Sequence, residues 1–172
     1  TERNLKTFIA RFHNVYGPYG TWDGGREKAP AALSRKVIEA VDTGDLSITI
    51  WGDGTQTRSF MFIDDCVKGI DMITHCDDLI ATPINLGSSY LISINDLVGM
   101  IEDIAGVELE RNYDLTKPRG VAGRNSDNTF ILEVLGWEPN TPLREGMEVT
   151  YNWIEQQYKA RKAGKHTPAG TI

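Results

Sequence analysis

Apolar residues recur along the chain at two spacings, and each spacing predicts a different kind of element. The short β-branched run Thr7–Phe12 is typical of a buried strand, and Gly17 soon after it signals a turn. The glycine-rich loop of residues 14–28 has a length that is usually functional in a compact domain. Pro30 suits the first turn of a helix, which we predict from Ala29 to Val41.

Two further strands are predicted on either side of the turn Gly52–Gly54. Leu46–Trp51 alternates apolar and polar residues, and Gln56–Ile63 follows the turn. The short connection predicts a hairpin over residues 46–63. Asp64 is a suitable N-cap for the next helix, whose apolar positions recur at helical spacing: Val67, Ile70 and Ile73.

The second half of the chain alternates short strands with helices that carry clear end signals. Ser93 is a suitable N-cap for an amphipathic helix that Gly106 ends. A short helix is predicted at Asn128–Leu135, and Pro142 opens a last helix before a polar segment, 161–172, that we expect to fray. The inner face of the last helix is predicted to hold Leu143, Met147, Tyr151, Ile154 and Tyr158. The other predicted strands are Pro83–Gly87, Tyr90–Ile92 and Val107–Tyr113.

Composition and charge narrow the classes of function. The 172 residues are 40% hydrophobic and 24% charged, which is ordinary for a globular protein. A net charge of −6 makes nucleic acid a poor partner, and no apolar run approaches the roughly 18–20 residues of a membrane span. Cys66 and Cys76 lack metal-ligand spacing, so we expect two reduced thiols of a cytoplasmic protein and no bound metal.

No glycine-rich turn joins a strand to a helix in the pattern of dinucleotide-binding sites. Gly52–Gly54 lacks the third glycine and follows no crossover helix. If NAD takes part in the function, its binding half lies outside this sequence. Tyr113 and Lys117 have the spacing of a short-chain dehydrogenase catalytic pair, but the segment before Pro118 is not helical, so we interpret this match as chance.

Several polar side chains are candidates for binding a diphosphate. Four of them are cations in glycine-bearing surroundings: Lys28, Lys36, Arg58 and Arg124. A guanidinium presents a planar fork of donors that fits two phosphate oxygens, although each cation could instead be an ordinary solvated charge. Asn14 follows the first predicted strand at its carboxyl end, where ligands of open α/β sheets bind, with a turn-forming asparagine as the alternative.

Lys28 and His13 are the candidates for proton chemistry. An amine held among other cations at a helix start suits acid/base work, while a simple ion pair with Glu27 is the alternative. His13 is either a ligand-binding residue or a packed core histidine.

Together these segments resemble a known family. Arg11–Pro18 and Gly52–Phe60 resemble a strand-and-loop and a substrate-domain hairpin of extended short-chain dehydrogenases. Three segments are similar to the GDP-mannose 3,5-epimerase family: Gly20–Ala32, Gly120–Asn128 and Leu135–Pro139. The resemblance implies an α/β fold, the C-terminal part of an extended short-chain dehydrogenase, with the edge of a Rossmann sheet and a small α/β substrate-binding domain.

The domains implied by the resemblance follow the order of the chain. Residues 1–45 would hold the last strand, substrate loop and helix of the Rossmann-like domain, 46–160 the small substrate-binding domain, and 161–172 a flexible tail. The implied partners are a GDP-sugar, a missing N-terminal half and a second copy in a homodimer, with no nucleic acid and no membrane.

The resemblance also implies an activity and a site. The reaction would be 3,5-epimerisation of GDP-mannose through NAD-dependent transient oxidation at C4, which acidifies the protons on C3 and C5. Lys28 would be one acid/base group; its partner, a cysteine, belongs to the missing half and matches neither Cys66 nor Cys76. NAD would be bound mainly by that half, with His13 as a contact from this chain. The positions implied to hold the GDP-sugar are Asn14, Glu27, Lys28, Ala29, Lys36, Gln56, Thr57, Arg58 and Arg124.

Two other functions stay open at this point. One is that of a UDP-sugar 4-epimerase or another sugar-nucleotide epimerase or dehydratase, and the other is a non-catalytic nucleotide-sugar-binding module. All of these functions require the four cations to converge on one cleft sized for two linked phosphates.

Overall fold

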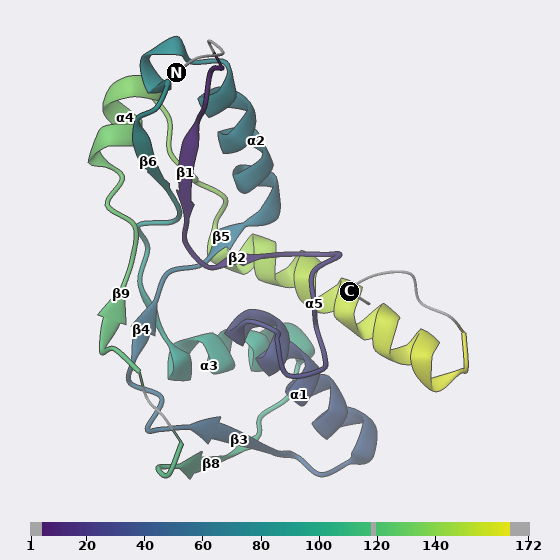
Figure 1. Cartoon of the computed structure of the whole chain (residues 1–172). Coiled ribbons are helices and arrows are strands. Elements are labelled where there is room, and N and C mark those ends of the chain that lie inside the picture. The colour runs from purple at the N-terminus through teal and green to yellow at the C-terminus, as the bar shows by residue number, and fades with distance from the viewer. Residues whose placement is uncertain (1–4, 118–119, 166–172) are drawn as a thin grey trace.

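The computed structural model describes residues 5–117 and 120–165 as a mixed α/β fold (Figure 1). The helices are α1 (Ala29–Thr43), α2 (Ile63–Thr74), α3 (Ile94–Ala105), α4 (Thr129–Leu135) and α5 (Leu143–Lys162), with a 3-10 helix η1 (Asp77–Leu79). The strands are β1 (Ile9–Phe12), β2 (Val15–Tyr16), β3 (Ser47–Trp51), β4 (Thr57–Arg58), β5 (Met61–Phe62), β6 (Pro83–Leu86), β7 (Ile92–Ser93), β8 (Glu110–Asp114) and β9 (Gly123–Arg124).

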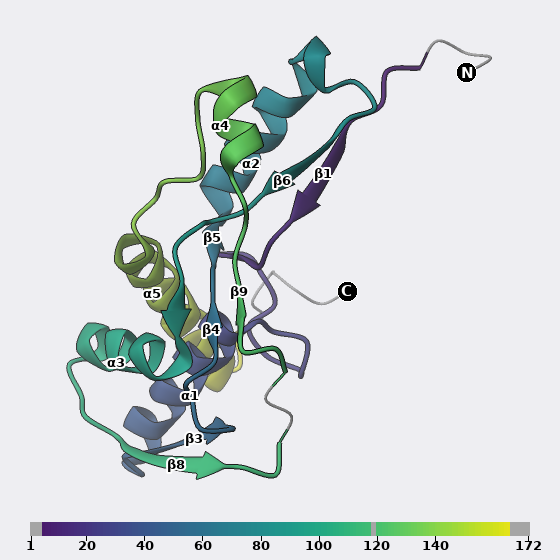
Figure 2. The same cartoon turned by 90° about the vertical axis from the view of Figure 1, so that its left-hand side faces the viewer.

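Most strands pair with a strand that is distant in the sequence. β1–β6, β2–β5 and β3–β8 are parallel pairs, while β4 lies between β7, which is antiparallel to it, and β9, which is parallel. Figure 2 shows β4 and β9 running side by side. Parallel pairs with helical connections are expected of an α/β fold.

The predicted hairpin over residues 46–63 is wrong. β3 pairs with β8, and the predicted second strand is broken into β4 and β5. The break lies at Ser59, which is fully buried and whose backbone oxygen accepts a hydrogen bond from Asn14 Nδ2 at 3.0 Å. Because Met61 N donates to the Asn14 oxygen at 3.1 Å, the chain leaves the β7–β4–β9 sheet here and joins β2.

Two apolar clusters form the core. The first lies among α1, α3 and α5 and includes Val37, Leu97, Ile101 and Ile154, all fully buried. The second lies among β1, β6, α2 and α4 and includes fully buried residues of β6. Figure 1 shows the elements of the second cluster above those of the first. The clusters are not divided at residue 45, since β1 packs in the second and α1 in the first; the proposed domain boundaries stay a prediction.

Local end signals explain where the helices α1 and α3 begin and end. Pro30 stands in the first turn of α1, and Gly44 adopts a left-handed conformation with its N–H bonded to the Ala40 oxygen. Ser93 caps α3 by accepting a hydrogen bond from Asp96 N at 3.0 Å, and Gly106 ends that helix. The predicted caps of α3 are confirmed.

The face that α2 buries differs from the predicted one. The helix begins at Ile63 without a side-chain cap from Asp64, and its buried residues include Cys66, Gly69 and Ile73. Of the predicted apolar face, only Ile73 is buried, because Val67 and Ile70 are 59% and 40% exposed. Gly69 explains this orientation, since a Cβ there would lie 2.4 Å from Leu86 Cδ1, and only glycine allows β6 to approach so closely.

The C-terminal elements agree with the pattern except at their ends. On α5, Met147, Tyr151 and Ile154 are buried as predicted, and Leu143 and Tyr158 are half-buried. Helix α5 continues to Lys162, inside the segment 161–172 predicted to fray. Residues 166–172 lie outside the described part, so the flexible tail stays a prediction. The strands predicted at Tyr90–Ile92 and Val107–Tyr113 are displaced toward the C-terminus, to β7 and β8.

The structure also describes the apolar character of the helices and the state of the two cysteines. In the described ranges, no helix is long and apolar enough to cross a bilayer. Cys66 and Cys76 are free thiols, the first buried and the second half-buried, and burial raises the pKa of Cys66.

Candidate functional site

The start of α1 lies where three cavities meet. Their volumes are about 370, 490 and 210 Å³. Glu27 lines the first and second cavities, Lys28 the first and third, and Ala29 the second and third. We refer to the cavity of about 370 Å³ as the loop cavity, to that of about 490 Å³ as the large cavity and to that of about 210 Å³ as the small cavity. Each of these three consecutive residues therefore belongs to the walls of two cavities.

The small cavity gathers several of the predicted site residues. Asn14, Lys28 and Arg58 line it together with Ala29 and Gln56. Arg58 reaches it from β4 and Lys28 from the start of α1, whereas Asn14 follows β1 with a positive φ of 30°. A cavity with a lysine, an arginine and an amide at its walls can bind a compact anion such as a diphosphate.

The large cavity joins the small one along Ala29, Gln56 and Ile94, which line both. Gln56 is buried: its Nε2 donates to the Trp51 oxygen at 3.2 Å, while its Oε1 has no hydrogen-bond partner. A buried acceptor without a partner favours a donor from a bound ligand, because leaving it unsatisfied costs about 1–3 kcal/mol.

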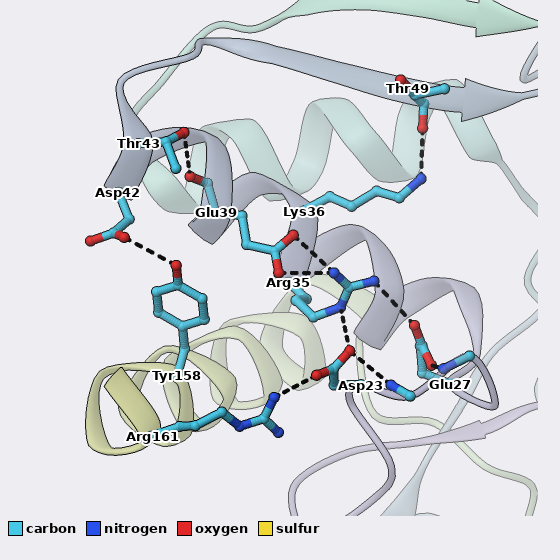
Figure 3. A network of polar contacts seen from close by, with 12 residues as sticks. Asp23, Glu27, Arg35, Lys36, Glu39, Asp42, Thr43, Thr49, Tyr158 and Arg161 are labelled. Carbon is cyan, nitrogen blue, oxygen red and sulfur yellow. Dashed lines mark hydrogen bonds and ion pairs between the residues drawn. The ribbon is translucent and has the colours of Figure 1, made fainter. Parts of the chain in front are cut away.

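Lys36 lies on the wall of the large cavity, one helical turn beyond Ala32. Its Nζ donates to the Thr49 oxygen at 2.7 Å (Figure 3). Burial, followed by the nearby Arg35 charge, lowers the pKa of Lys36 from its usual value. Trp51, 56% exposed, offers a flat apolar surface on the same cavity.

Arg124 lies beside Arg58 but outside the three cavities. The two arginines are directly opposite each other in the parallel pair β4–β9, so their side chains leave the sheet on the same face. Thr57 is likewise not among the residues that line these cavities, and its hydroxyl lies 3.5 Å from the Ala122 oxygen. The structure therefore brings Lys28 and Arg58 to one cavity, with Lys36 on the wall of the adjoining large cavity and Arg124 beside Arg58 but outside these cavities.

His13 lies next to the arginine of β9. A Cβ on Gly87 would lie 2.5 Å from His13 Cβ, so the histidine packs tightly against the end of β6. Burial, then the charges of Arg124 and Arg11, lower the pKa of His13. The imidazole is therefore neutral near pH 7 and can both donate and accept a hydrogen bond.

Glu27 is held as an ionised carboxylate. Burial opposes its ionisation, but hydrogen bonds from backbone N–H groups and from Arg35 outweigh burial and lower its pKa. Gly25 N donates to Oε2 at 2.7 Å, and Arg35 Nη2 donates to Oε1 at 3.2 Å. Sequence reasoning did not single out Arg35; its only local signal was the i, i+4 spacing to Glu39 on a helix face.

The described residues carry neither the glycine turn typical of a dinucleotide site nor a cluster of metal-ligating side chains. Within residues 5–117 and 120–165, no strand leads into a helix through the Gly-x-Gly-x-x-Gly turn of dinucleotide-binding sites, because the glycines of the loop between β2 and α1 stand at other spacings. The same ranges hold no group of three histidine, cysteine, aspartate or glutamate side chains that could bind a metal ion. No chemical step through a nucleotide cofactor is therefore assigned to these residues.

The parallel strands, their helices and the cation-lined cavities define an α/β protein of the Rossmann-related class. Residues 1–87 match the model of the NAD dependent epimerase/dehydratase family, and the chain belongs to this family. It is 48% identical over 90% of its length to GDP-mannose 3,5-epimerase of Arabidopsis thaliana and 30% identical over 87% to a probable GDP-L-fucose synthase of Oryza sativa subsp. japonica. The chain spans 39% and 45% of the lengths of these relatives.

Solved structures agree with the fold. UDP-glucose 4-epimerase from Thermotoga maritima, determined with UDP-glucose, superposes with a TM-score of 0.79 at 26% identity, over 91% of this chain and 48% of that one. UDP-glucuronic acid 4-epimerase from Bacillus cereus, in complex with UDP-glucuronic acid and NAD, gives a TM-score of 0.73 at 31% identity, over 88% and 46%. The expected fold class, part of a short-chain dehydrogenase of the epimerase type, is confirmed.

Proposed function

We propose that this chain supplies the substrate-binding part of a GDP-mannose 3,5-epimerase. The observation that carries the proposal is the small cavity, where Lys28, Arg58 and Asn14 meet although they are far apart in the sequence. Two cations and an amide in one cavity of about 210 Å³ suit a diphosphate. The 48% identity to the Arabidopsis enzyme supports GDP-mannose as the nucleotide sugar.

The three cavities suggest how such a ligand lies. The diphosphate occupies the small cavity, with Arg124 and Thr57 at its edge. The nucleoside occupies the large cavity, where Trp51 and Ile94 supply apolar surface and Gln56 Oε1 accepts a hydrogen bond. The sugar reaches the loop cavity, which Lys28 and Glu27 also line.

In this arrangement Lys28 is the acid/base residue of the chain. Its amine takes a proton from a sugar carbon next to a carbonyl and, once protonated, returns one to such a carbon. General acid–base groups contribute about 10²–10⁴-fold to rates when they are within hydrogen-bond reach of the proton. Lys28 suits this role because it lines both the small cavity and the loop cavity.

The remaining parts of the proposal concern groups outside the described residues. We propose that NAD is bound mainly by an N-terminal half, with the neutral His13 imidazole as a contact from this chain. NAD supplies reversible oxidation of the sugar hydroxyl when bound. We also propose that the complete protein is a homodimer in the cytoplasm.

The 172-residue chain by itself is expected not to turn over GDP-mannose. The proposed reaction needs a cofactor site and a second acid/base group, and the proposal assigns both to the N-terminal half. An epimerase assay on the purified chain, followed by chromatography of the sugar nucleotide, checks this. Product formed without an added N-terminal half would contradict the proposal.

Arg58→Met is expected to weaken GDP binding about 10- to 100-fold, because a charged hydrogen bond contributes roughly 1.5–3 kcal/mol. Methionine keeps much of the side-chain volume and removes the donors. Titration calorimetry of the protein with GDP measures the change. Arg144→Met is the matched control, because Arg144 of α5 is exposed and pairs with Glu148 of the same helix and with Asp103 of α3. Equal affinity in Arg58→Met and the unmodified protein would remove Arg58 from the site.

A UDP-sugar 4-epimerase is the second candidate function, favoured by the TM-score of 0.79 to the Thermotoga enzyme. Competition between GDP-mannose and UDP-glucose for the protein separates the two, since the proposed function requires tighter binding of GDP-mannose. A non-catalytic binding module would bind a nucleotide sugar without exchanging its carbon-bound protons in any complete form of the protein.

A further inference from the structure

Ion pairs with Arg35 connect the loop between β2 and α1 to helix α1, and no local sequence pattern predicts them. Figure 3 shows Arg35 of α1 at the centre, with Glu39 on its own helix and Asp23 and Glu27 on the loop. Arg35 Nη1 lies 2.8 Å from Glu39 Oε2, Nη2 3.2 Å from Glu27 Oε1, and Nε 3.5 Å from Asp23 Oδ1. Arg35 therefore contacts the loop twice, through a hydrogen bond to Glu27 and through a longer ion pair with Asp23 in which Nε makes no hydrogen bond.

The contact between Arg35 and Glu27 is sheltered from solvent, whereas the side chains of Asp23 and Glu39 are 37% and 40% exposed. The side chains of Arg35 and Glu27 are 19% and 7% exposed. Burial disfavours the guanidinium charge, but the hydrogen bond and charge of Glu39, followed by Glu27, outweigh it and raise the pKa of Arg35. An ion pair with so little solvent is screened less than a surface pair, so its geometry is held more firmly.

The carboxylates that Arg35 contacts are themselves bonded to two glycines. Asp23 Oδ1 accepts from Gly24 N at 2.7 Å, and Glu27 Oε2 accepts from Gly25 N at 2.7 Å. Both glycines have positive φ, 97° and 84°, and a Cβ on either would meet nothing within 4 Å. The side of each glycine on which a Cβ would stand is open, so packing there does not fix the backbone, and the hydrogen bonds to Asp23 and Glu27 contribute to holding it.

Helix α5 provides a second attachment for the same loop. Arg161 Nη1 lies 2.5 Å from Asp23 Oδ2, and its guanidinium lies 4.0 Å from the ring centroid of Trp22, which is 4% exposed. The ring centroids of Tyr19 on the loop and Trp153 on α5 are 5.6 Å apart. The loop is thus attached to α5 on one side and to Arg35 on the other, immediately before Lys28.

We propose that Arg35 is a positioning residue for Lys28. Its guanidinium holds Asp23 and Glu27, these hold the backbone of the glycine pair, and that backbone fixes where Lys28 stands between the loop cavity and the small cavity. The inference rests on the proposed function for the role of Lys28, but the attachment of the loop is independent of it. Arg35 acts through the loop and makes no proton transfer itself.

The test compares Arg35→Lys with Glu39→Gln in the complete protein. Lysine keeps the charge but lacks the planar fork, so it cannot hold Asp23 and Glu27 together. Glu39→Gln alters the third partner of the same guanidinium and leaves both loop contacts. We expect Arg35→Lys to lower kcat for solvent-deuterium incorporation into the sugar of GDP-mannose at least tenfold, with a smaller change in affinity for GDP. For Glu39→Gln, both kcat for deuterium incorporation and the affinity for GDP are expected to stay within twofold of the unmodified protein.

A second readout reports the loop itself. The amide proton of Gly25 is expected to exchange with solvent at least tenfold faster in Arg35→Lys, because its acceptor Glu27 loses the Arg35 contact, and at the unmodified rate in Glu39→Gln. The amide proton of Gly24 is expected to change less in Arg35→Lys, because Arg161 still holds Asp23. Asp23→Asn, a milder change at a half-exposed site, is expected to act in the same direction on Gly24. Unchanged amide exchange in Arg35→Lys, or equal losses of kcat in Arg35→Lys and Glu39→Gln, would overturn the inference.

The two proposals fail in different ways. If the unmodified complete protein incorporates no deuterium from solvent into GDP-mannose, the proposed function fails and the role of Lys28 fails with it. If the unmodified protein incorporates deuterium and Arg35→Lys does so at the same rate, the proposed function stands and only the positioning role of Arg35 is overturned.

Discussion

Lys28→Met is expected to abolish incorporation of solvent deuterium into the sugar while GDP-sugar affinity stays within about tenfold, or ~1.4 kcal/mol. Methionine retains an unbranched apolar side chain but has no amine to exchange a proton. Arg58 and Asn14 still line the small cavity in the variant, so most of the diphosphate contacts survive. Lys28→Met should therefore lose proton exchange while it keeps most of its affinity for the GDP-sugar.

The measurement for Lys28→Met uses the complete protein in deuterium oxide. Nuclear magnetic resonance follows the C3 and C5 protons of GDP-mannose, and calorimetry gives the affinity for GDP-mannose. Lys159→Met is the matched control, because Lys159 is an exposed residue of α5 that pairs with Glu155. Normal deuterium incorporation at both carbons in Lys28→Met would remove Lys28 from the mechanism, whereas a loss of binding alone would make it a ligand contact only.

Ile154→Ala is expected to lower the free energy of unfolding by about 2–5 kcal/mol, the range for truncating a fully buried aliphatic side chain. Ile154 is completely buried in the first cluster, on the face that α5 presents to α1 and α3. Its loss leaves a space between helices that rigid neighbours fill only in part. The same helix carries Trp153 and Arg161, which hold the loop before Lys28.

Urea denaturation of the protein checks the effect of Ile154→Ala. The midpoint should fall while the slope with denaturant stays the same. Val149→Ala is the control on the same helix, because Val149 is 46% exposed and its truncation is expected to cost less than about 0.5 kcal/mol. A midpoint shift for Ile154→Ala no larger than that for Val149→Ala would contradict the assignment of this core.

The sequence predicted elements best where their causes are local. The apolar spacing of α3, the Ser93 cap and Gly106 all act within a few residues, and all three are confirmed. The hairpin over residues 46–63 failed because strand pairing depends on distant partners. Ser47 pairs with Glu110, and no pattern within residues 46–63 records that. The face of α2 failed for a similar reason, since the approach of Leu86 to Gly69 is a tertiary contact.

In the candidate site too, some features could be predicted from the sequence, while those that depend on distant partners could not. The resemblance named Lys28, Arg58 and Asn14, and the structure brings these three to one cavity. It places Arg124 beside Arg58 rather than inside that cavity. The loop attachments escaped sequence reasoning because Asp23 and Arg161 are 138 residues apart, and nothing near either residue marks the other as its partner. Charged residues show their role in a network only when their partners are placed.

The two apolar clusters are built from interleaved segments. The chain passes from β1 in the second cluster to α1 in the first and returns to the second with α2 and β6. It then crosses to α3 in the first cluster, to α4 in the second and to α5 in the first. Neither half of the core can therefore be excised as a continuous piece of gene and grafted elsewhere. Heating should melt both in a single cooperative transition, and a break in one connecting loop should leave the pieces held together by the remaining crossings.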